Sequence, residues 1–453
     1  MSNKTHFIAL VFVGLLISTA SAKDFVYTSA ELSKEMSNIV PLVNQGDYAQ
    51  AQTLTQKLIA DFSKDPELPK ALSDIADRYR WADKYEEAKT IYRQIIQDYP
   101  DSPIAADARF GLARMDVLSS IWLWKFDDAK AAFDKMVTDF SNHPDFPEEL
   151  YWTARKYGWS EMHEEEKAIY QQVVEKYPDS PYAVKASLGA ARANVQSLIL
   201  SKDYEGAQKA VDKMVVDFAN NPYLHDALYW IAERDEWAGR CENAKSLYQQ
   251  IIQNYPDSSS AGKAKFGLSR VNAQSLIISG EYDSAEEAVD KLIADFAGHP
   301  DLPKAVMFIG EQCYKQGLAE GKQGLTEQAK IRYGKAAEIW ENLQDKFPES
   351  SLIPEVCGWT GDCYIKLGKY EESIRCFQKV VDSYPEYKHA GHAQYMVGRG
   401  YEELKNTGVL EESIADTHIK DAYEKVVLNY PDCPAITYVN SWLSREAEAE
   451  KEK

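Results

Sequence analysis

Apolar side chains recur every three or four residues along most of the chain, which is the period of an amphipathic helix. Between residues 85 and 99 they form one stripe, made of Ala88, Ile91, Tyr92, Ile95, Ile96 and Tyr99. Pro100 disfavours a helical conformation for the residue before it, so this helix should end at Tyr99. Ser102 can cap a following helix, and Pro103 suits its first position. The pattern predicts helices joined by short turns, without strand-like alternation.

This helical pattern repeats every 78 residues. The sequence Tyr-Pro-Asp-Ser recurs at this step, beginning at Tyr99, Tyr177 and Tyr255. A tryptophan keeps the same step, at Trp81, Trp159 and Trp237. Residues 177–218 and 255–296 are identical at 23 of 42 aligned positions. Such internal repetition is the signature of a stacked helical array, and tandem duplication explains it.

Each 78-residue block divides into two helical hairpins, which predicts about ten hairpins between Leu32 and Pro431. We expect a signal peptide at 1–22, a solenoid at 23–431 with double repeats at 63–140, 141–218 and 219–296, and a polar capping helix or tail at 432–453. Insertions interrupt the repeat at about 315–328 and about 405–418. Because stacked hairpins bury their stripes against their neighbours, one globular core is not needed.

Small and aromatic residues stand at characteristic positions in two of the hairpins. In residues 354–385 these are Gly361, Tyr364, Gly368, Tyr370, Phe377 and Pro385. In a second hairpin they are Ala232, Gly239, Ala244, Tyr248 and Pro256. The hairpins resemble the tetratricopeptide repeat (TPR), although Cys357, Thr360 and Ser373 replace its usual residues. The resemblance implies an all-α fold, an α-solenoid of about ten TPR hairpins wound into a right-handed superhelix.

A short sequence at the ends of three helices narrows the resemblance. Two β-branched residues precede the Tyr-Pro-Asp-Ser run at 96–102, 174–180 and 252–258. This form is similar to exported bacterial TPR proteins, the BamD-like outer-membrane assembly lipoproteins and the Tol–Pal accessory protein CpoB (YbgF). No cysteine for lipid attachment follows the expected cleavage site. The resemblance implies a non-catalytic protein that takes part in envelope assembly or division.

The first residues have the pattern of a secretory signal peptide. Lys4 precedes an apolar run from Phe7 to Ile17, and Ala20-Ser21-Ala22 forms a small-residue cleavage site. A helix of this run rises only about 16 Å, at roughly 1.5 Å per residue, which is too short for a bilayer core of about 30 Å. We therefore expect an exported protein, periplasmic or secreted, with no membrane span.

The charge excludes some classes of partner. The 453 residues include 51 Lys and Arg against 71 Asp and Glu, a net charge of −20. Binding of nucleic acid needs clustered cations, so nucleic acid is not an expected partner. The charge is spread over the repeats, which suits solubility and a basic or extended segment of a protein partner. The oligomeric state stays open.

Candidate catalytic or metal-binding chemistry is sparse. The sequence has no GxxxxGK[ST], HExxH, GxSxG or CxxC motif. His389 and His392 have metal spacing but no carboxylate or cysteine in register. His143 and His299 share a repeat position that Asp65 fills in another block, which is typical of a turn. We expect no enzyme activity, no cofactor and no bound metal.

All six cysteines lie in the second half of the chain. In an oxidising compartment, neighbouring thiols tend to pair. Cys363 and Cys376 fall on the two arms of one hairpin and could form a disulfide, whereas Cys357 and Cys363 are six residues apart on one helix and cannot. Free buried thiols are the alternative.

The recurring tryptophans mark the candidate binding surface. Residues four apart share one helix face, and in TPR proteins the first helix of each hairpin lines the concave surface. The candidate partner-binding residues are Trp81, Tyr151, Arg155, Trp159, Tyr229, Glu233 and Trp237. Aromatic residues mixed with charges are typical of binding hot spots. Packing between repeats is an equal alternative for these tryptophans, and it is the main role expected for Trp122 and Trp124.

The preferred function is an exported protein–protein interaction scaffold that binds a partner segment in its concave groove. An alternative is an extracytoplasmic small-molecule or glycan binding protein, in which stacked tryptophan and tyrosine rings would hold sugar faces.

Overall fold

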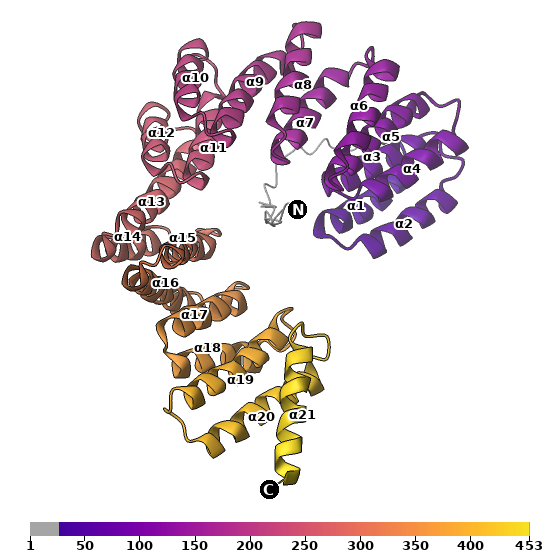
Figure 1. Ribbon diagram of the computed structural model, residues 1–453. Coiled ribbons are helices and arrows are strands. Elements are labelled where there is room, and N and C mark those ends of the chain that lie inside the picture. The colour runs from indigo at the N-terminus through magenta and orange to yellow at the C-terminus, as the bar shows by residue number, and fades with distance from the viewer. Residues whose placement is uncertain (1–26, 453) are drawn as a thin grey trace. The chain divides into compact units, whose positions relative to one another are not determined.

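The computed structural model describes residues 27–452, which form helices joined by turns, with no strand among them (Figure 1). The expected signal peptide at 1–22 lies outside the described residues. The first helices are α1 (Ala30–Gln45), α2 (Tyr48–Asp61), α3 (Leu68–Trp81), α4 (Tyr85–Asp98), α5 (Pro103–Trp122), α6 (Phe126–Phe140), α7 (Phe146–Trp159), α8 (His163–Lys176), α9 (Pro181–Leu200) and α10 (Tyr204–Asp217). They are followed by α11 (Leu224–Trp237), α12 (Cys241–Asn254), α13 (Ser259–Ser279), α14 (Tyr282–Asp295), α15 (Leu302–Lys322), α16 (Thr326–Lys346), α17 (Ile353–Leu367), α18 (Tyr370–Ser383), α19 (Ala390–Asn406), α20 (Glu412–Asn429) and α21 (Ile436–Glu452).

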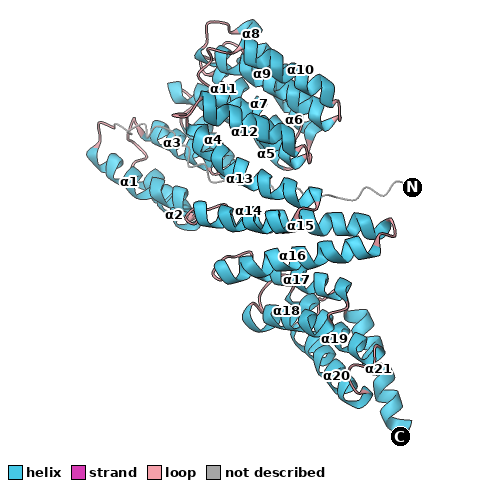
Figure 2. Cartoon of the chain, turned by 90° about the vertical axis from the view of Figure 1, so that its left-hand side faces the viewer, coloured by secondary structure: helices cyan, strands magenta, loops and turns pink. Residues whose placement is uncertain are grey.

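The helices pair into ten antiparallel hairpins, each made of an odd-numbered first helix and an even-numbered second helix, and α21 follows the last hairpin (Figure 2). Local chemistry sets the boundaries. The Ser102 side chain accepts a hydrogen bond from the backbone N–H of Ile104 (3.3 Å), and Pro103 opens α5. The helix before it ends at Asp98, with Tyr99 as its C-cap, as expected from Pro100. The all-α solenoid of ten hairpins predicted from the sequence is confirmed.

The chain divides into two compact units, unit 1 up to Ala193 and unit 2 from Asn194 onward, with the division inside α9. In unit 1 one apolar cluster joins α1 to α5 and another joins α5 to α9. In unit 2 a large cluster extends from α13 to α20, and Trp340 is fully buried within it. Each apolar cluster is therefore built from neighbouring hairpins, as the stripe pattern requires.

Glycines let neighbouring helices approach one another closely. A side chain at Gly111 on α5 would come within 2.7 Å of the Tyr92 ring on α4. Gly189 stands in the same way against Tyr170, and Gly267 against Tyr248, one repeat and two repeats later. A Cβ atom does not fit at such distances, so the tyrosine ring packs directly on the helix backbone. The small residues Ala232 and Ala244 are likewise fully buried.

The first insertion is helical. Helices α15 and α16 are each 21 residues long, against 14 in α11 and in α12, so each carries seven extra residues. They run side by side and are joined through Gly324 at φ 81° (Figure 2). The second insertion similarly lengthens α19 and α20 to 17 and 18 residues. Both insertions thus extend hairpins within unit 2.

The turn inside each hairpin needs a residue in the left-handed conformation. In one set of turns this residue is Asp83, Glu161 or Gly239, each 78 residues apart. In the alternate set it is Trp124, Lys202 or Gly280. Glycine adopts positive φ without strain, whereas a bulky side chain does not. Trp124, at φ 58°, therefore adopts a backbone conformation that is unfavourable for a bulky side chain.

Candidate partner-binding surface

Tryptophans at the ends of two first helices of unit 1 are only partly covered. Trp81 closes α3 and is 47% exposed, while Trp159 closes α7 and is 56% exposed. The Trp81 ring meets the Trp152 ring of α7 edge-on, with centroids 5.7 Å apart. The hairpin of α5 and α6 lies between these two helices in the chain, so this contact joins alternate hairpins.

Cations complete a continuous row of rings and charges. Arg80 lies 4.0 Å over the Trp81 ring. Arg155 lies 5.1 Å from the Trp152 ring centre and 5.5 Å from that of Trp159. Lys156 Nζ lies 4.8 Å from the centre of the Trp159 ring. We call this row the cation–aromatic strip; it consists of Arg80, Trp81, Trp152, Arg155, Lys156 and Trp159.

Two of the three cations in the strip have carboxylate partners. Arg80 Nε lies 3.3 Å from Asp77 Oδ1. Lys156 Nζ lies 2.8 Å from Asp83 Oδ1 and so ties α7 to the turn after α3. Arg155 has no ion pair with any residue that the structure describes. A cation over an aromatic ring gains about 0.5–1 kcal/mol at an exposed site, less than a bidentate carboxylate can add.

The corresponding residues of unit 2 have a different charge. Trp237 closes α11, is 56% exposed and packs on Phe308 of α15 at 4.9 Å between ring centroids. The Tyr229 hydroxyl donates a hydrogen bond to Glu233 Oε1 (2.8 Å). Burial raises the pKa of Glu233, and the nearby Arg270 only partly opposes this. The tryptophan is kept in this copy, but an acid replaces the arginine.

The predicted residues thus fall into two sets. In unit 1, Arg155 and Trp159 are joined directly, and Tyr151 lies beside them, against Trp152, with ring centroids 5.4 Å apart. Tyr151 also contacts Tyr170 and Tyr182, so its main role is to pack against other aromatic rings. In unit 2, Tyr229, Glu233 and Trp237 share one face of α11. Sequence reasoning missed Trp152 and Arg80. Trp152 lies seven positions, or two helical turns, before Trp159, and Arg80 directly precedes Trp81.

Sequence reasoning also missed a buried arginine that recurs at the 78-residue step, at Arg114, Arg192 and Arg270. In the first copy Arg114 Nη2 lies 2.5 Å from Asp77 Oδ1, and the Tyr92 hydroxyl donates to the same oxygen (2.9 Å). Arg114 also lies 3.4 Å from Glu149, which is almost fully buried. Burial opposes the charge of Arg114, but these partners outweigh it and raise its pKa. The 78-residue spacing of these arginines was the signal in the sequence that could have revealed them.

The carboxylate that neutralises this arginine comes from a different position in each repeat. In the third copy Arg270 forms two hydrogen bonds with Glu236, at 2.6 and 2.7 Å. In the second copy Arg192 bonds Glu166 of α8, at a position where the other copies have alanine. Gly158 leaves space for it, because a Cβ there would lie 2.4 Å from the Glu166 carboxyl. The repeat keeps the ion pair, not the identity of the acid.

Packing, the main role expected for Trp122 and Trp124, accounts for only part of these two side chains. These residues are 49% and 56% exposed at the turn between α5 and α6, and Leu123 between them is 58% exposed. The Trp122 ring meets the Tyr85 ring edge-on, with centroids 6.3 Å apart, and Trp124 contacts Phe126. The helix ends at Trp122, so the following residues lie in a turn that projects beyond the packed stripe.

All six cysteines are free thiols in the structure, and the disulfide suggested for Cys363 and Cys376 is not formed. Burial raises the pKa of the Cys376 thiol to about 12 and shifts that of Cys363 upward as well. Nearby thiols add to the rise of these pKa values, Cys313 and Cys376 for that of Cys363, and Cys357 for that of Cys376. Their burial favours the alternative of free apolar thiols, because a thiol that stays protonated is a poor nucleophile.

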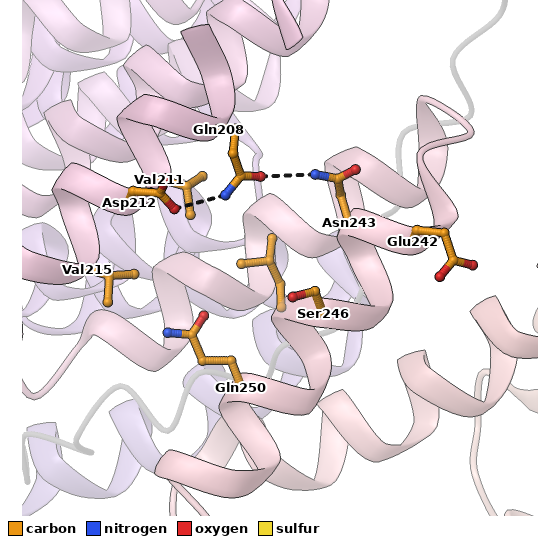
Figure 3. A pocket seen from close by; sticks show the side chains of 9 residues that line it. Gln208, Val211, Asp212, Val215, Glu242, Asn243, Ser246 and Gln250 are labelled. Carbon is orange, nitrogen blue, oxygen red and sulfur yellow. Dashed lines mark hydrogen bonds between the residues drawn. The ribbon is translucent and has the colours of Figure 1, made fainter. Parts of the chain in front are cut away.

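One groove of unit 2 lies between the second helices α10 and α12 (Figure 3). Its polar side chains satisfy one another: Gln208 Nε2 donates to Asp212 Oδ1 (2.9 Å), and Asn243 Nδ2 donates to Gln208 Oε1 (3.0 Å). The groove contains no aromatic anchor. Among residues 27–452, no three His, Cys, Asp or Glu side chains are grouped to hold a metal ion. No helix described combines the length and apolar character needed to cross a membrane.

Four segments of the chain match models of a known family of repeats. Models described as tetratricopeptide repeat match residues 71–102, 150–180, 226–258 and 354–387. Three of these segments contain a tryptophan discussed above, Trp81, Trp159 or Trp237. These segments of the α-solenoid are therefore similar to the tetratricopeptide repeat, a type of repeat that generally mediates protein–protein interactions. A search of curated proteins found no significant match.

Solved structures that match this chain include three of low sequence identity. A tetratricopeptide repeat protein from Parabacteroides merdae is 11% identical and has a TM-score of 0.37, covering 61% of this chain and 98% of its own. Aspartyl phosphate phosphatase F from Bacillus subtilis is 14% identical, with a TM-score of 0.39 and coverage of 81% and 96%. The P58(IPK) TPR domain is 16% identical, with a TM-score of 0.24 and coverage of 94% and 100%.

Proposed function

We propose that this protein is a non-catalytic scaffold that binds an extended segment of a protein partner along the first helices of its hairpins. The observation that carries the proposal is the set of half-exposed tryptophans at Trp81, Trp159 and Trp237. Trp81 and Trp237 each pack on a ring of another first helix, so their positions are held before a partner arrives. Rigid aromatic anchors lose little conformational entropy on binding and are typical of hot spots.

Packing between repeats accounts for only part of this arrangement. A tryptophan used solely to fill the interface between hairpins would be buried, as Trp340 is. Trp81 and Trp237 instead use one part of the ring for packing and leave about half of the side chain exposed. The dual use supports a binding role for the exposed part.

The environment of the rings favours a protein segment over a glycan. Sugar binding by stacking requires an open aromatic face. Arg80 covers the Trp81 ring, and Arg155 and Lys156 lie over Trp159. The remaining surface is a mixture of ring edges and cations, which suits side chains of a polypeptide.

We also propose that the protein is exported to the periplasm or secreted and acts in envelope assembly or division. The proposal rests on the signal-like residues 4–22 and on the resemblance to exported bacterial repeat proteins. Fractionation of the native host together with N-terminal sequencing tests it. Recovery of the uncleaved chain in the cytoplasm would contradict it.

Site-specific photo-crosslinking in the native host tests the binding surface. A photoreactive phenylalanine at position 159 or 237 should form covalent adducts with a partner polypeptide. Val216 on the second helix α10 is 76% exposed and provides a matched control position, which should give none. Adducts that are equally abundant at all three positions, or absent from 159 and 237, would show that the first-helix surface is not the binding face.

A further inference from the structure

Arg155 stands at a repeat position where the neighbouring copies have an acid. The residue 78 positions earlier is Asp77, and the residue 78 positions later is Glu233. Both acids serve the buried arginine of their own repeat: Asp77 bonds Arg114, and Glu233 lies 3.9 Å from Arg270. The charge at this position is therefore reversed only in the middle copy of the three.

In the middle repeat, the residue at position 155 does not have to neutralise the buried arginine. Its buried Arg192 is neutralised by Glu166 from α8, and Gly158 makes the space for that carboxylate. An acid at position 155 is no longer needed to balance the buried charge. Arg155 is thus neither required by the ion pair nor engaged in it, and it projects among Trp152 and Trp159 instead.

The guanidinium of Arg155 has unused hydrogen-bonding capacity. It makes no hydrogen bond and no ion pair with the residues that the structure describes. An arginine presents five N–H donors in a fork that matches a carboxylate, and the rings beside it hold the fork in place. A group with this chemistry is suited to bind a carboxylate in two-point fashion.

The acids around the strip already have hydrogen-bonding or ion-pair partners. Asp77 is shared by Arg80 and Arg114, and Asp83 by Lys156 and the hydroxyl of Tyr85. Glu148 accepts the indole N–H of Trp152 at 3.3 Å. Arg155 is the cation of the strip that lacks a counter-charge. The net charge of −20 favours basic partners in general, but the local chemistry at this strip is that of an acid receptor.

We propose that the cation–aromatic strip of unit 1 recognises an acidic segment of a protein partner. An aspartate or glutamate carboxylate of that segment binds Arg155, and an adjacent apolar side chain packs on the exposed parts of Trp81 and Trp159. The inference rests on the proposed function, because it identifies the chemistry of the segment that the scaffold binds. It assigns the contact to unit 1, where α3 and α7 carry the strip.

A selection from an unbiased phage-displayed peptide library, performed on the chain from residue 23 onward, tests the proposal. Enriched peptides should contain Asp or Glu beside an apolar residue. Their affinity should fall about tenfold in Arg155→Gln, as expected for loss of one charged two-point hydrogen bond. The matched control is Arg93→Gln, which removes the same charge from an exposed site on the second helix α4 and should leave the affinity unchanged. Circular dichroism should show that both variants keep their helicity.

The alternative outcomes separate this inference from the function on which it rests. Enrichment of basic or uncharged peptides, or unchanged affinity in Arg155→Gln, would overturn it. If such peptides nevertheless lose affinity in Trp159→Ala, the scaffold function stands and only the acidic specificity fails. If no peptide is enriched, or none depends on Trp159, both fail. Binding of polygalacturonate that depends on Arg155, without peptide binding, would instead assign the strip to an acidic glycan.

Discussion

At the scale of single residues, the most consequential feature is the arginine that each repeat buries. A charged group taken out of water costs several kcal/mol unless a partner compensates it. The repeats meet this cost with a carboxylate that comes from Asp77, Glu166 or Glu236. Because any carboxylate in reach satisfies the arginine, the supplying position can change between copies. That freedom is what leaves Arg155 available to a partner.

Replacement of Arg114 by methionine should destabilise unit 1 by about 3 kcal/mol, because Glu149 would remain buried without a counter-charge. Hydrogen exchange of the α7 backbone should report the loss locally. Arg93→Met, at an exposed position of α4, provides the control and should change stability by less than about 0.5 kcal/mol. Equal protection of α7 in both variants would contradict the buried ion pair.

Asp235 makes the stability of unit 2 depend on pH. Burial raises its pKa from 3.8 to about 6, and the attraction of Arg240 offsets this only in part. In the unfolded chain its pKa is about 3.9, so between pH 4 and 6 only the folded state binds the proton. The stabilisation from this group is therefore full below about pH 4 and is lost as the pH rises through 6.

The variant Asp235→Asn cannot ionise and should avoid this loss. Its unfolding free energy relative to the natural chain should increase between pH 4 and 6 and then level off. The total change should approach about 3 kcal/mol, at roughly 1.36 kcal/mol per pKa unit. Thermal unfolding at a series of pH values measures it. A difference that stays constant with pH would show that the carboxyl titrates normally.

At the scale of the element, the contact between a glycine and a tyrosine ring determines how closely successive helices stack. The pair recurs in three repeats, with the glycine on the first helix and the ring on the preceding second helix. A methyl group at the glycine would overlap the ring, and well-packed interfaces relax only partially around such an overlap. This contact therefore limits the substitutions that the stack accepts.

Gly267→Ala should destabilise unit 2 by about 1–3 kcal/mol, because the new Cβ would lie 2.6 Å from the Tyr248 ring. Gly262 lies on the same helix with no neighbour within 4 Å of the corresponding position. Gly262→Ala should instead stabilise the helix by about 0.5–1 kcal/mol through its helix propensity. Urea unfolding of both variants gives the comparison. The same sign for the two substitutions would rule out a steric origin.

At the scale of the whole molecule, most contacts between helices are made within a hairpin or between hairpins that are neighbours in the chain. The chain nevertheless divides into two compact units. Stability in such an array is approximately the sum of hairpin and interface contributions, so different parts can unfold at different denaturant concentrations. A single unfolding free energy does not describe a protein of this kind.

Unfolding should therefore occur in more than one step. Gly189→Ala, in unit 1, and Gly267→Ala, in unit 2, should lower the midpoints of different transitions. Hydrogen exchange analysed by mass spectrometry follows the two units separately during denaturation. Identical shifts of all peptides in both variants would indicate one cooperative unit instead.

Much of the fold could be predicted from the sequence because helix formation and helix boundaries depend on residues that are close together in the chain. The stripe of residues 85–99, the proline after it and the 78-residue period determine which residues form helices and how the hairpins repeat. The insertion near residue 320 was recognised by its length, but whether it formed a loop or longer helices depended on pairing between α15 and α16. The exposure of Trp122 and Trp124 was missed because a turn at the end of α5 exposes residues that continue the apolar pattern.

The sequence by itself determined the helical class, the number of hairpins and the tryptophan positions, because periodicity and helix boundaries depend on neighbouring residues. Only the tertiary structure decided which charges are paired. Asp77, Arg155 and Glu233 occupy equivalent positions, yet their roles depend on side chains from α5, α8 and α13. Ion pairing requires contact between helices that are far apart in the chain, and such contacts have no spacing rule. The unpaired Arg155, and with it the cation–aromatic strip, becomes visible only when the helices are packed.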